Sequence, residues 1–237
     1  MYEQDYYKNQ EENLFEFSQK DVRLGFIRKV YLILATQLTV TAAIIGIGLA
    51  SEAYRQFMLH HVWTIFVALA LNIVCIYAIY CTNTCGRQVP YNYICASIFT
   101  VTEAYIFSSF TSFLDPEIVF IAAVLTAAMT ISLTIYAMTT KTDVTYCGGF
   151  LFMLCIMLIV GGILSYCFNS KVFAVGLSII TIMVFGLYVI YDTQLIMGDR
   201  KRKLSTDDYI IAATSLYIDI MRIFLEVLKI LAATQKR

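Results

Sequence analysis

The sequence is poor in charge, proline and histidine. Of its 237 residues, 14% are charged, two are proline and two are histidine, whereas 59% are hydrophobic. A soluble domain of this length cannot hide so much apolar surface in one core. The two histidines, His60 and His61, are adjacent, so the His-rich clusters of intramembrane metal hydrolases are absent. We therefore expect an integral membrane protein with no resident cofactor.

Motifs for enzymatic catalysis are absent as well. The sequence has no glycine-rich phosphate loop, and no serine or cysteine has a histidine at a matching depth that could activate it. We expect neither an enzyme nor a nucleic-acid partner. Residues 1–21 are acidic and aromatic and lack the apolar run of a secretory signal. They are expected to form a disordered cytosolic tail, with or without a regulatory role, ahead of a helical bundle at 22–237.

Long uncharged stretches are the dominant feature of the rest of the chain. A helix needs about 17–25 such residues to cross a hydrocarbon slab ~30 Å thick. Six stretches meet this requirement. A seventh, 209–228, contains Asp219, Arg222 and Glu226. Placing each of these charges in lipid costs roughly 2.5–3.5 kcal/mol, which outweighs the favourable transfer of the apolar residues unless other helices surround the segment. We expect an all-α bundle of seven transmembrane helices with the last helix central, or six spans and a re-entrant segment. The six clean stretches are 30–51, 62–86, 91–114 (broken only by Glu103), 118–140, 144–170 and 172–191.

Basic residues fall mainly on one side of these spans. With a cytosolic amino terminus, only Arg55 and Lys171 lie outside, which agrees with the positive-inside rule. Full crossing by 209–228 would place Lys229 outside as well, whereas a re-entrant segment would keep it inside, and both remain open. The basic loop 198–205 is either an inner-leaflet lipid contact or an orientation signal. The inside residues are Lys8, Lys20, Arg23, Arg28, Lys29, Arg87, Lys141, Arg200, Lys201, Arg202 and Lys203.

The seven cysteines do not suggest a disulfide framework, because their number is odd and most lie within or at the ends of spans. We expect reduced packing residues. Cys81 and Cys85, near the inner end of the second span, are alternatively sites for palmitoylation. Pairs of small residues are spaced for close helix contacts. These are Ala42 and Gly46, Ala123 and Ala127, Gly148 and Gly149, and Gly161 and Gly162.

Ionisable residues inside the spans mark either function or structural pairing. Asp219, Arg222 and Glu226 share one helix face, so they could form a self-neutralising ladder. Alternatively, Asp192 lies ~7 Å from the end of its span and can meet Asp219. Two carboxylates in a site of low dielectric constant cannot both ionise freely, so one holds a proton. Their oxygens also suit Ca²⁺, which predicts a proton-gated Ca²⁺ path with this pair as transient ligands.

Four segments resemble the transmembrane Bax-inhibitor-motif family, in particular its lifeguard and Golgi anti-apoptotic branch. They agree with the family in order and spacing, and the match runs from about residue 20 to the end of the chain. The segments are VRLGFIRKVYLILATQLTVT (22–41), VPYNYICASIFTVTEAY (89–105), TKTDVTYCGGFLF (140–152) and YDTQLIMGDRKRKLSTDDYIIAATSLYIDI (191–220).

The resemblance implies a seven-helix bundle with a central last helix, a pH-regulated Ca²⁺ leak from intracellular stores, and protection from apoptosis. Asp192 of YDTQ and Asp219 of LYIDI correspond to the family's paired aspartates. Asp207 and Asp208 stand where the family usually has two glutamates, which implies an acidic vestibule at the cytosolic mouth. Glu103 corresponds to an acid that some members carry in the third span.

Arg222 departs from the family pattern, which usually has a neutral residue three places after the last aspartate. We expect the arginine to hold Asp219 ionised and to repel cations, so that Arg222, Glu226 and Glu103 modulate the aspartate pair. The chain is then either a Ca²⁺ leak or a non-conducting scaffold that binds death receptors, apoptosis regulators or other calcium channels. Membrane lipids are partners in both cases, and the Golgi or endoplasmic reticulum is the expected location, with the plasma membrane as the alternative.

Overall fold

The structure is a computed structural model that describes residues 2–168, 170–200 and 202–235, with side chains from residue 20 onward. Within these ranges it contains helices and connecting loops and no strand, which confirms the all-α prediction. The elements are α1 (Tyr2–Ala50), α2 (Glu52–His60), α3 (Trp63–Cys81), α4 (Asn83–Arg87), α5 (Tyr91–Thr111), α6 (Pro116–Thr139), the 3₁₀ helix η1 (Val144–Cys147), α7 (Gly148–Phe168), α8 (Lys171–Met197) and α9 (Tyr209–Gln235).

Six helical segments of the described chain are long and apolar enough to cross a membrane. Many of their apolar side chains point outward. In the most apolar 18-residue stretch of the span that contains α7, only 6% is buried inside the protein. Such a surface would drive aggregation in water, whereas lipid solvates it and a helix satisfies its backbone internally. The prediction of a helical membrane bundle is confirmed. The segments are Lys20–Ala50, Trp63–Cys81, Tyr91–Thr111, Pro116–Thr139, Val144–Phe168 and Lys171–Met197.

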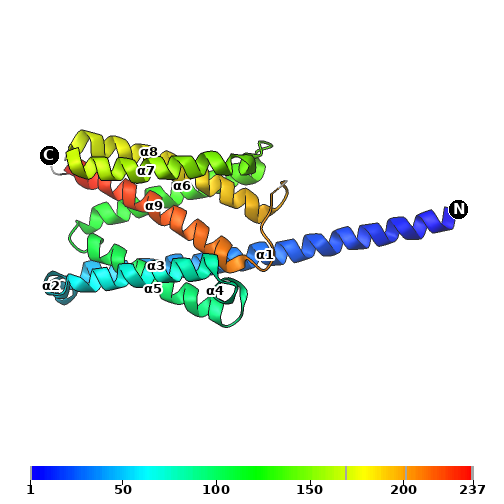
Figure 1. Ribbon diagram of the computed structural model, residues 1–237, viewed down its shortest axis with the longest axis horizontal. Helices are drawn as coiled ribbons and strands as arrows, with labels where there is room; N and C mark the ends of the chain where they lie inside the picture. The colour runs from blue at the N-terminus through cyan, green and yellow to red at the C-terminus, as the bar shows by residue number, and fades with distance from the viewer. Residues whose placement is uncertain (1, 169, 201, 236–237) are drawn as a thin grey trace.

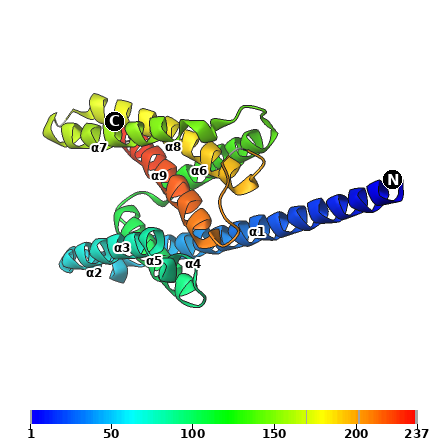
Figure 2. The same cartoon turned by 45° about the vertical axis from the view of Figure 1, so that its right-hand side comes forward.

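Helix α9 lies in the middle of this bundle. Figures 1 and 2 show α1, α3 and α5 on one side, α6, α7 and α8 on the other, and α9 running obliquely between the two groups. It packs most extensively against α8, and also against α1 and α6. Most of its side chains are buried, including those of Asp219 and Glu226. Surrounding helices therefore shield the two acids of this segment, as predicted, whereas the Arg222 side chain is exposed.

The two ends of α9 lie at opposite ends of the bundle. We call the end that holds α4 the Arg87 end and the end that holds the turn before α6 the Asp115 end. The helix starts beside Arg87, which pairs with Asp208. At its other terminus, Gln235 Nε2 donates to Asp115 Oδ2 at 3.1 Å. With 27 residues, α9 is about 40 Å long and extends past the predicted limit at 228.

Helix α1 begins at Tyr2 and projects beyond the bundle at the Arg87 end (Figures 1 and 2). The structure therefore gives helix in the segment 1–21, where the sequence predicted a disordered tail. The division of the chain into a tail at 1–21 and a bundle at 22–237 stays a prediction.

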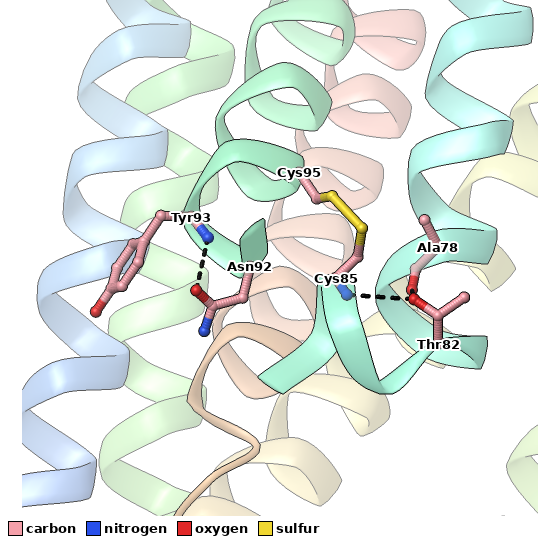
Figure 3. The surroundings of a disulfide bond; sticks show 6 residues. All are labelled: Ala78, Thr82, Cys85, Asn92, Tyr93 and Cys95. Carbon is pink, nitrogen blue, oxygen red and sulfur yellow. Dashed lines mark hydrogen bonds between the residues drawn. A yellow bond between two sulfur atoms is a disulfide. The ribbon is translucent and has the colours of Figure 1, made fainter. Parts of the chain in front are cut away.

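The predicted span 62–86 is two helices, because Thr82 ends α3 and begins α4. The Thr82 backbone N–H donates to Ala78 O at 3.1 Å, which is the last hydrogen bond of α3, and the φ and ψ angles of Thr82 are those of an extended chain. The Thr82 side chain then caps α4 by accepting from Cys85 N at 3.2 Å. A helix whose first free N–H groups are capped in this way can start in a new direction. The short α4 consequently turns toward α5 (Figure 3).

The structure joins Cys85 of α4 to Cys95 of α5 in a disulfide, with their Cα atoms 5.9 Å apart (Figure 3). The expectation that both cysteines are free is therefore wrong. Counting cysteines could not reveal that α4 folds back beside the first turns of α5. A disulfide also removes Cys85 as a site for palmitoylation, whereas Cys81 is free and exposed.

The small residues have two different environments. A Cβ on Gly161 would lie 2.9 Å from Leu177 of α8, and one on Gly148 would lie 2.9 Å from Tyr191, so these two glycines do mark close contacts. Gly46 has nothing within 4 Å of such a position. Together with Ala42, Ala123 and Ala127 it borders an apolar groove of about 700 Å³ between α1 and α6, floored by α9. The predicted close contact is wrong there.

Arg23 fixes the end of α8 and the following loop at the Arg87 end. Arg23 of α1 donates from Nη2 to Leu195 O at 2.6 Å, from Nη1 to Leu204 O at 2.8 Å and from Nε to Met197 O at 3.2 Å. These carbonyls lie in the last turn of α8 and in the loop after it. The free carbonyls of a helix terminus need such donors, so Arg23 ties α1 to the end of α8.

The loop between α6 and η1 is held in the same region. Gln194 of α8 is buried and makes two hydrogen bonds, donating to Thr142 O and accepting from Val144 N, both at 2.9 Å. Arg200 donates to the carbonyls of Thr140 and Lys141. Arg200, in the basic loop 198–205, therefore caps the carboxyl end of α6. The lipid-contact and orientation interpretations of that loop stay predictions.

Candidate functional site

Asp192 of α8 and Asp219 of α9 lie close enough to interact electrostatically. They meet because α8 and α9 form the most extensive helix pair in the bundle. The Asp219 side chain is 5% exposed, and its Oδ2 has no hydrogen-bond partner among the described residues. A buried polar atom without a protein partner is rare and demands a proton, water or an ion. The structure thus brings together the two carboxyl groups that the sequence selected.

Two tyrosines that sequence reasoning missed accompany this pair. Tyr80 of α3 shares a 2.7 Å hydrogen bond with Ser215 Oγ and interacts electrostatically with both aspartates. Tyr188 interacts with both as well. Ser215 precedes Asp219 by four residues and Tyr188 precedes Asp192 by four, so each lies on the same helix face as its aspartate. That spacing was a signal in the sequence, and it surrounds the carboxyl groups with hydroxyl groups.

Further buried polar atoms lie toward the Arg87 end of the pair. Thr214 Oγ1 is buried and lacks a hydrogen-bond partner in the described ranges, and Tyr31 OH and Thr193 Oγ1 are buried near each other. Thr193 follows Asp192 directly, and Tyr31 of α1 lies near Thr193. The helices around the aspartates are therefore polar in the half of the bundle that leads to the Arg87 end. Polar atoms of this kind can hydrogen-bond to water.

Arg222 does not have the position that the sequence predicted. The electrostatic neighbours of Asp219 are Asp192 and Cys155, whereas Arg222 interacts with Glu103 of α5. The Arg222 side chain is exposed. The two positions are about 60° apart around the helix axis, but Asp219 is buried whereas Arg222 is exposed at the edge of that face. The expectation that Arg222 neutralises Asp219 directly is therefore wrong, and the structure groups Arg222 with Glu103.

Glu226 has partners other than Arg222. Its Oε1 pairs with Lys229 Nζ at 2.7 Å, and its Oε2 accepts from Ser178 Oγ of α8, also at 2.7 Å. The Glu226 side chain is 8% exposed, so both of its oxygens are satisfied inside the protein. The ladder of Asp219, Arg222 and Glu226 consequently does not form. Lys229, one turn further along α9, supplies the counter-charge.

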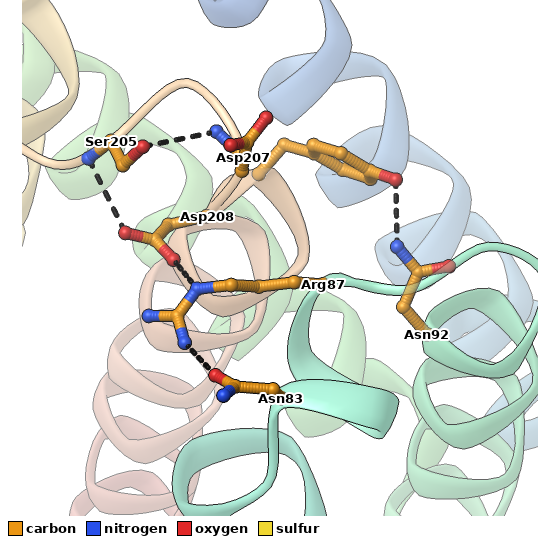
Figure 4. Close-up of polar contacts among 7 residues, drawn as sticks. Asn83, Arg87, Asn92, Ser205, Asp207 and Asp208 are labelled. Atoms are coloured by element: carbon orange, nitrogen blue, oxygen red, sulfur yellow. Dashed lines mark hydrogen bonds and ion pairs between the residues drawn. The ribbon is translucent and has the colours of Figure 1, made fainter.

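Asp207 and Asp208 lie at the start of α9 (Figure 4). Asp208 is 7% exposed, pairs with Arg87 Nε at 2.6 Å and accepts from Ser205 N at 3.3 Å. Arg87 also donates to Asn83 of its own helix α4. Asp208 therefore anchors the amino terminus of α9 to α4, and Asp207 is the acid that stays exposed. The acidic vestibule remains a prediction, and of the two acids only Asp207 is solvent-facing.

The described residues contain no cluster of three or more His, Cys, Asp or Glu side chains that could hold a metal ion. Ca²⁺ in a stable protein site takes 6–8 oxygen ligands. Asp192 and Asp219 supply carboxylate oxygens from two residues, and the nearby hydroxyl groups of Tyr80 and Tyr188 are weak ligands. This set is smaller than the ligand set of a stable Ca²⁺ site.

The chain is similar to known proteins over most of its length. A sequence model of the family described as "Inhibitor of apoptosis-promoting Bax1" matches residues 23–236. The chain belongs to this family. Protein lifeguard 3 of Homo sapiens is 34% identical over 225 residues, which cover 91% of this chain and 71% of the relative. Protein lifeguard 3 of Mus musculus is 33% identical over 227 residues (92% and 72%), and Protein lifeguard 4 of Mus musculus is 32% identical over 216 residues (91% and 88%).

Membership of the Bax1-inhibitor family confirms the resemblance inferred from the four sequence segments. The matched region includes every candidate site residue, from Glu103 to Glu226, and leaves out only the first residues of α1 and the last residue of the chain. The chain is therefore a multi-pass membrane protein of an anti-apoptotic family, and its aspartate pair lies in the part that defines the family.

Proposed function

We propose that this protein is a pH-regulated Ca²⁺ leak path in an intracellular store membrane, Golgi or endoplasmic reticulum, through which it limits apoptosis. The observation that carries the proposal is Asp219: its carboxyl group is buried in the central helix, beside Asp192, with one oxygen unpartnered. A buried acid next to another acid is costly to keep, and structural pairing does not explain it here.

A shared proton provides the gate. Two carboxyl groups that interact inside a medium of low dielectric constant cannot both carry full charge, so the pair retains one proton over a range of pH. In that state the pair attracts a divalent cation weakly. When the pH rises and the proton leaves, the doubly negative pair attracts Ca²⁺ strongly. The leak therefore increases as the pH rises.

The two halves of the path differ in charge. Toward the Arg87 end, the aspartates are followed by Thr193 and Thr214, and Asp207 is exposed near the start of α9. Positive-inside bias makes this end cytosolic, with the amino terminus on the same side. Toward the Asp115 end, Arg222, Glu226 and Lys229 line a cavity between α7, α8 and α9. A net positive charge there slows cations, so the leak is small.

That positive charge also favours a second candidate function. If Arg222 stops cations entirely, the protein is a non-conducting scaffold that binds death receptors, other apoptosis regulators or other calcium channels. The aspartate pair is then a structural feature of the family bundle. The two functions differ in whether the purified protein transports Ca²⁺ by itself.

Ca²⁺ flux into liposomes that contain only the purified protein separates the candidates. We expect wild-type flux to rise with pH, and Asp219→Asn to lower the flux at the higher pH by about tenfold or more, since ~1.4 kcal/mol in a barrier changes a rate tenfold. The variant should also lose the pH response, because Asp192 alone has no partner with which to share a proton. Glu117→Gln, an exposed acid in the first turn of α6, is the matched control and should behave as wild type. Absence of wild-type flux at both pH values would favour the scaffold.

A further inference from the structure

The helix α9 is central, yet one of its faces is only partly covered by other helices. The side chains on this face are partly or fully exposed, and they recur at the spacing of a single helix stripe. Near the middle of the stripe lies Arg222. We call this stripe the open face of α9. It consists of Ile211, Ser215, Ile218, Arg222, Leu225 and Lys229.

The half of the open face toward the Asp115 end borders a cavity of about 780 Å³ between α7, α8 and α9. Volumes of about 300–1,000 Å³ are typical of sites for small molecules. One wall is apolar, with Leu158 and Ile159 of α7 and Leu177 and Phe185 of α8. Ile159 is 66% exposed, so the apolar wall continues into the surface of α7 that faces lipid.

The charged residues that line the cavity, Arg222, Glu226 and Lys229, give its α9 side a net positive charge. Lys229 and Glu226 neutralise each other at 2.7 Å, and buried Ser178 completes the partners of Glu226. Arg222 makes no hydrogen bond or ion pair with any residue that the structure describes, and its interaction with Glu103 is longer in range. The guanidinium therefore retains donors for an outside acceptor. Planar pairing of two N–H groups with a carboxylate is the strongest contact that it can make.

The depth of Arg222 determines the kind of anion. The residue lies midway between Tyr209 and Gln235, about 20 Å from either end of α9. The phosphate of a membrane lipid stays at the surface of a hydrocarbon slab ~30 Å thick and reaches this depth only at a high desolvation cost. A fatty acid can enter hydrocarbon as the neutral acid, then bind as the carboxylate after its proton passes to water. A single acyl chain also suits the volume and the apolar wall.

We propose that this cavity binds a long-chain fatty acid, with its carboxylate on Arg222 and its acyl chain along α7 and α8. The carboxylate supplies a direct ion-pair partner for an arginine deep in the bundle, where charged side chains are rare and usually paired, and Arg222 has no such partner among the described residues. The proposal concerns a binding site and does not depend on whether the protein conducts Ca²⁺.

Binding of oleate and oleyl alcohol to the full chain in nanodiscs at pH 8 tests it. The two probes have the same tail, and only oleate carries a charge. We expect oleate to bind wild-type protein at least tenfold more tightly than the alcohol, and Arg222→Gln to abolish that preference, because only the guanidinium forms charge-assisted hydrogen bonds with the carboxylate. Arg222→Lys should retain part of it. Arg202→Gln, which changes an exposed cation outside the cavity, should leave it intact.

Two further measurements locate the ligand. A photoreactive oleate should label peptides from 155–185 and 218–229, and phosphatidic acid should compete with it poorly. Equal binding of oleate and the alcohol to wild type, or labelling confined to other helices, would overturn the proposal. Stronger binding of phosphatidic acid would assign the cavity to a phospholipid instead. These results need only the wild-type protein, so they hold even if Arg222→Gln does not fold.

Discussion

Gly198 ends α8 in the left-handed region, with φ of 74°. A side chain at this φ costs roughly 1–2 kcal/mol. The position is also crowded, because a Cβ would lie 2.5 Å from Arg23 Cζ. The guanidinium cannot move away without loss of its three carbonyl acceptors on α8 and the following loop. Gly198 therefore has two roles. It adopts the left-handed backbone that ends α8, and its lack of a side chain leaves room for the Arg23 guanidinium of α1.

We expect Gly198→Ala to destabilise the protein by about 2–4 kcal/mol, which sums the backbone cost and part of the Arg23 clamp. In a chain of this length each kcal/mol lowers Tm by about 2–4 °C. Thermal unfolding in detergent, followed by loss of the monodisperse species, measures the effect. Gly149→Ala is the control, because its helical backbone tolerates alanine and nothing lies within 4 Å of the new Cβ. Equal Tm values for the two variants would show that Arg23 does not hold α8.

At the scale of single residues, the sequence identified the charges but not their partners. Asp192 and Asp219 could be matched because both lie at calculable depths in adjacent spans. The partners of Arg222 and Glu226 depend on which face of α9 turns toward α8, and apolar residues on nearly every side of that helix conceal its rotation. The structure assigns Lys229 and Ser178 to Glu226. The three-residue spacing to Lys229 was a signal in the sequence, whereas the contact with Ser178 of α8 could not be read from spacing.

Helix α9 has the length and the end contacts of a membrane-crossing element. Its start is fixed by the ion pair of Asp208 with Arg87, and its last turn contacts Asp115 at the other end of the bundle. A re-entrant segment would return to the side on which it began. The helices that pack around most of it remove the need for α9 itself to be apolar. The positive-inside rule is weak evidence against the crossing, because few basic residues follow the helix.

Full crossing predicts that the two termini lie on opposite sides of the membrane. A glycosylation acceptor added after Arg237 should be modified in microsomes, and one added before Tyr2 should not. The amino-terminal fusion is the matched control for expression and insertion. If neither acceptor is modified while the protein folds, α9 does not bring its end across, and the re-entrant alternative is correct.

Element boundaries were predictable where a residue type carries a strong local signal. Asp115 followed by Pro116 starts α6, and Ser170 starts α8, each with its side chain on a free backbone N–H. The break at Thr82 was missed, because hydrophobic residues continue across it and threonine is common inside membrane helices. Consequently α4, and with it the Cys85–Cys95 disulfide, could not be derived from the composition or from the odd number of cysteines.

Across the whole molecule, α9 lies between two groups of helices, and different buried residues of α9 contact each group. Asp219 faces α8, whereas Phe224 packs on Phe107 of α5 with ring centroids 6.2 Å apart. Arg222 lies on the open face between the groups and interacts with Glu103 on the α5 side. The positive charge of Arg222 therefore raises the electrostatic potential of the cavity toward the Asp115 end and is not confined to one ion pair. A cation that reaches the aspartates from that end has to pass it.

Removal of this charge should increase conduction, if the protein conducts. We expect Arg222→Asn to raise Ca²⁺ flux into liposomes about tenfold at a fixed pH, since ~1.4 kcal/mol of lost repulsion is enough, while Asp219→Asn in the same background cancels the gain. Oleate should act like the substitution on wild type, because a bound carboxylate neutralises Arg222, and it should have little effect on the variant. Oleyl alcohol controls for disturbance of the bilayer. Flux that is unchanged by Arg222→Asn would mean that the path avoids the open face, and an oleate response that persists in the variant would mean that the fatty acid acts elsewhere.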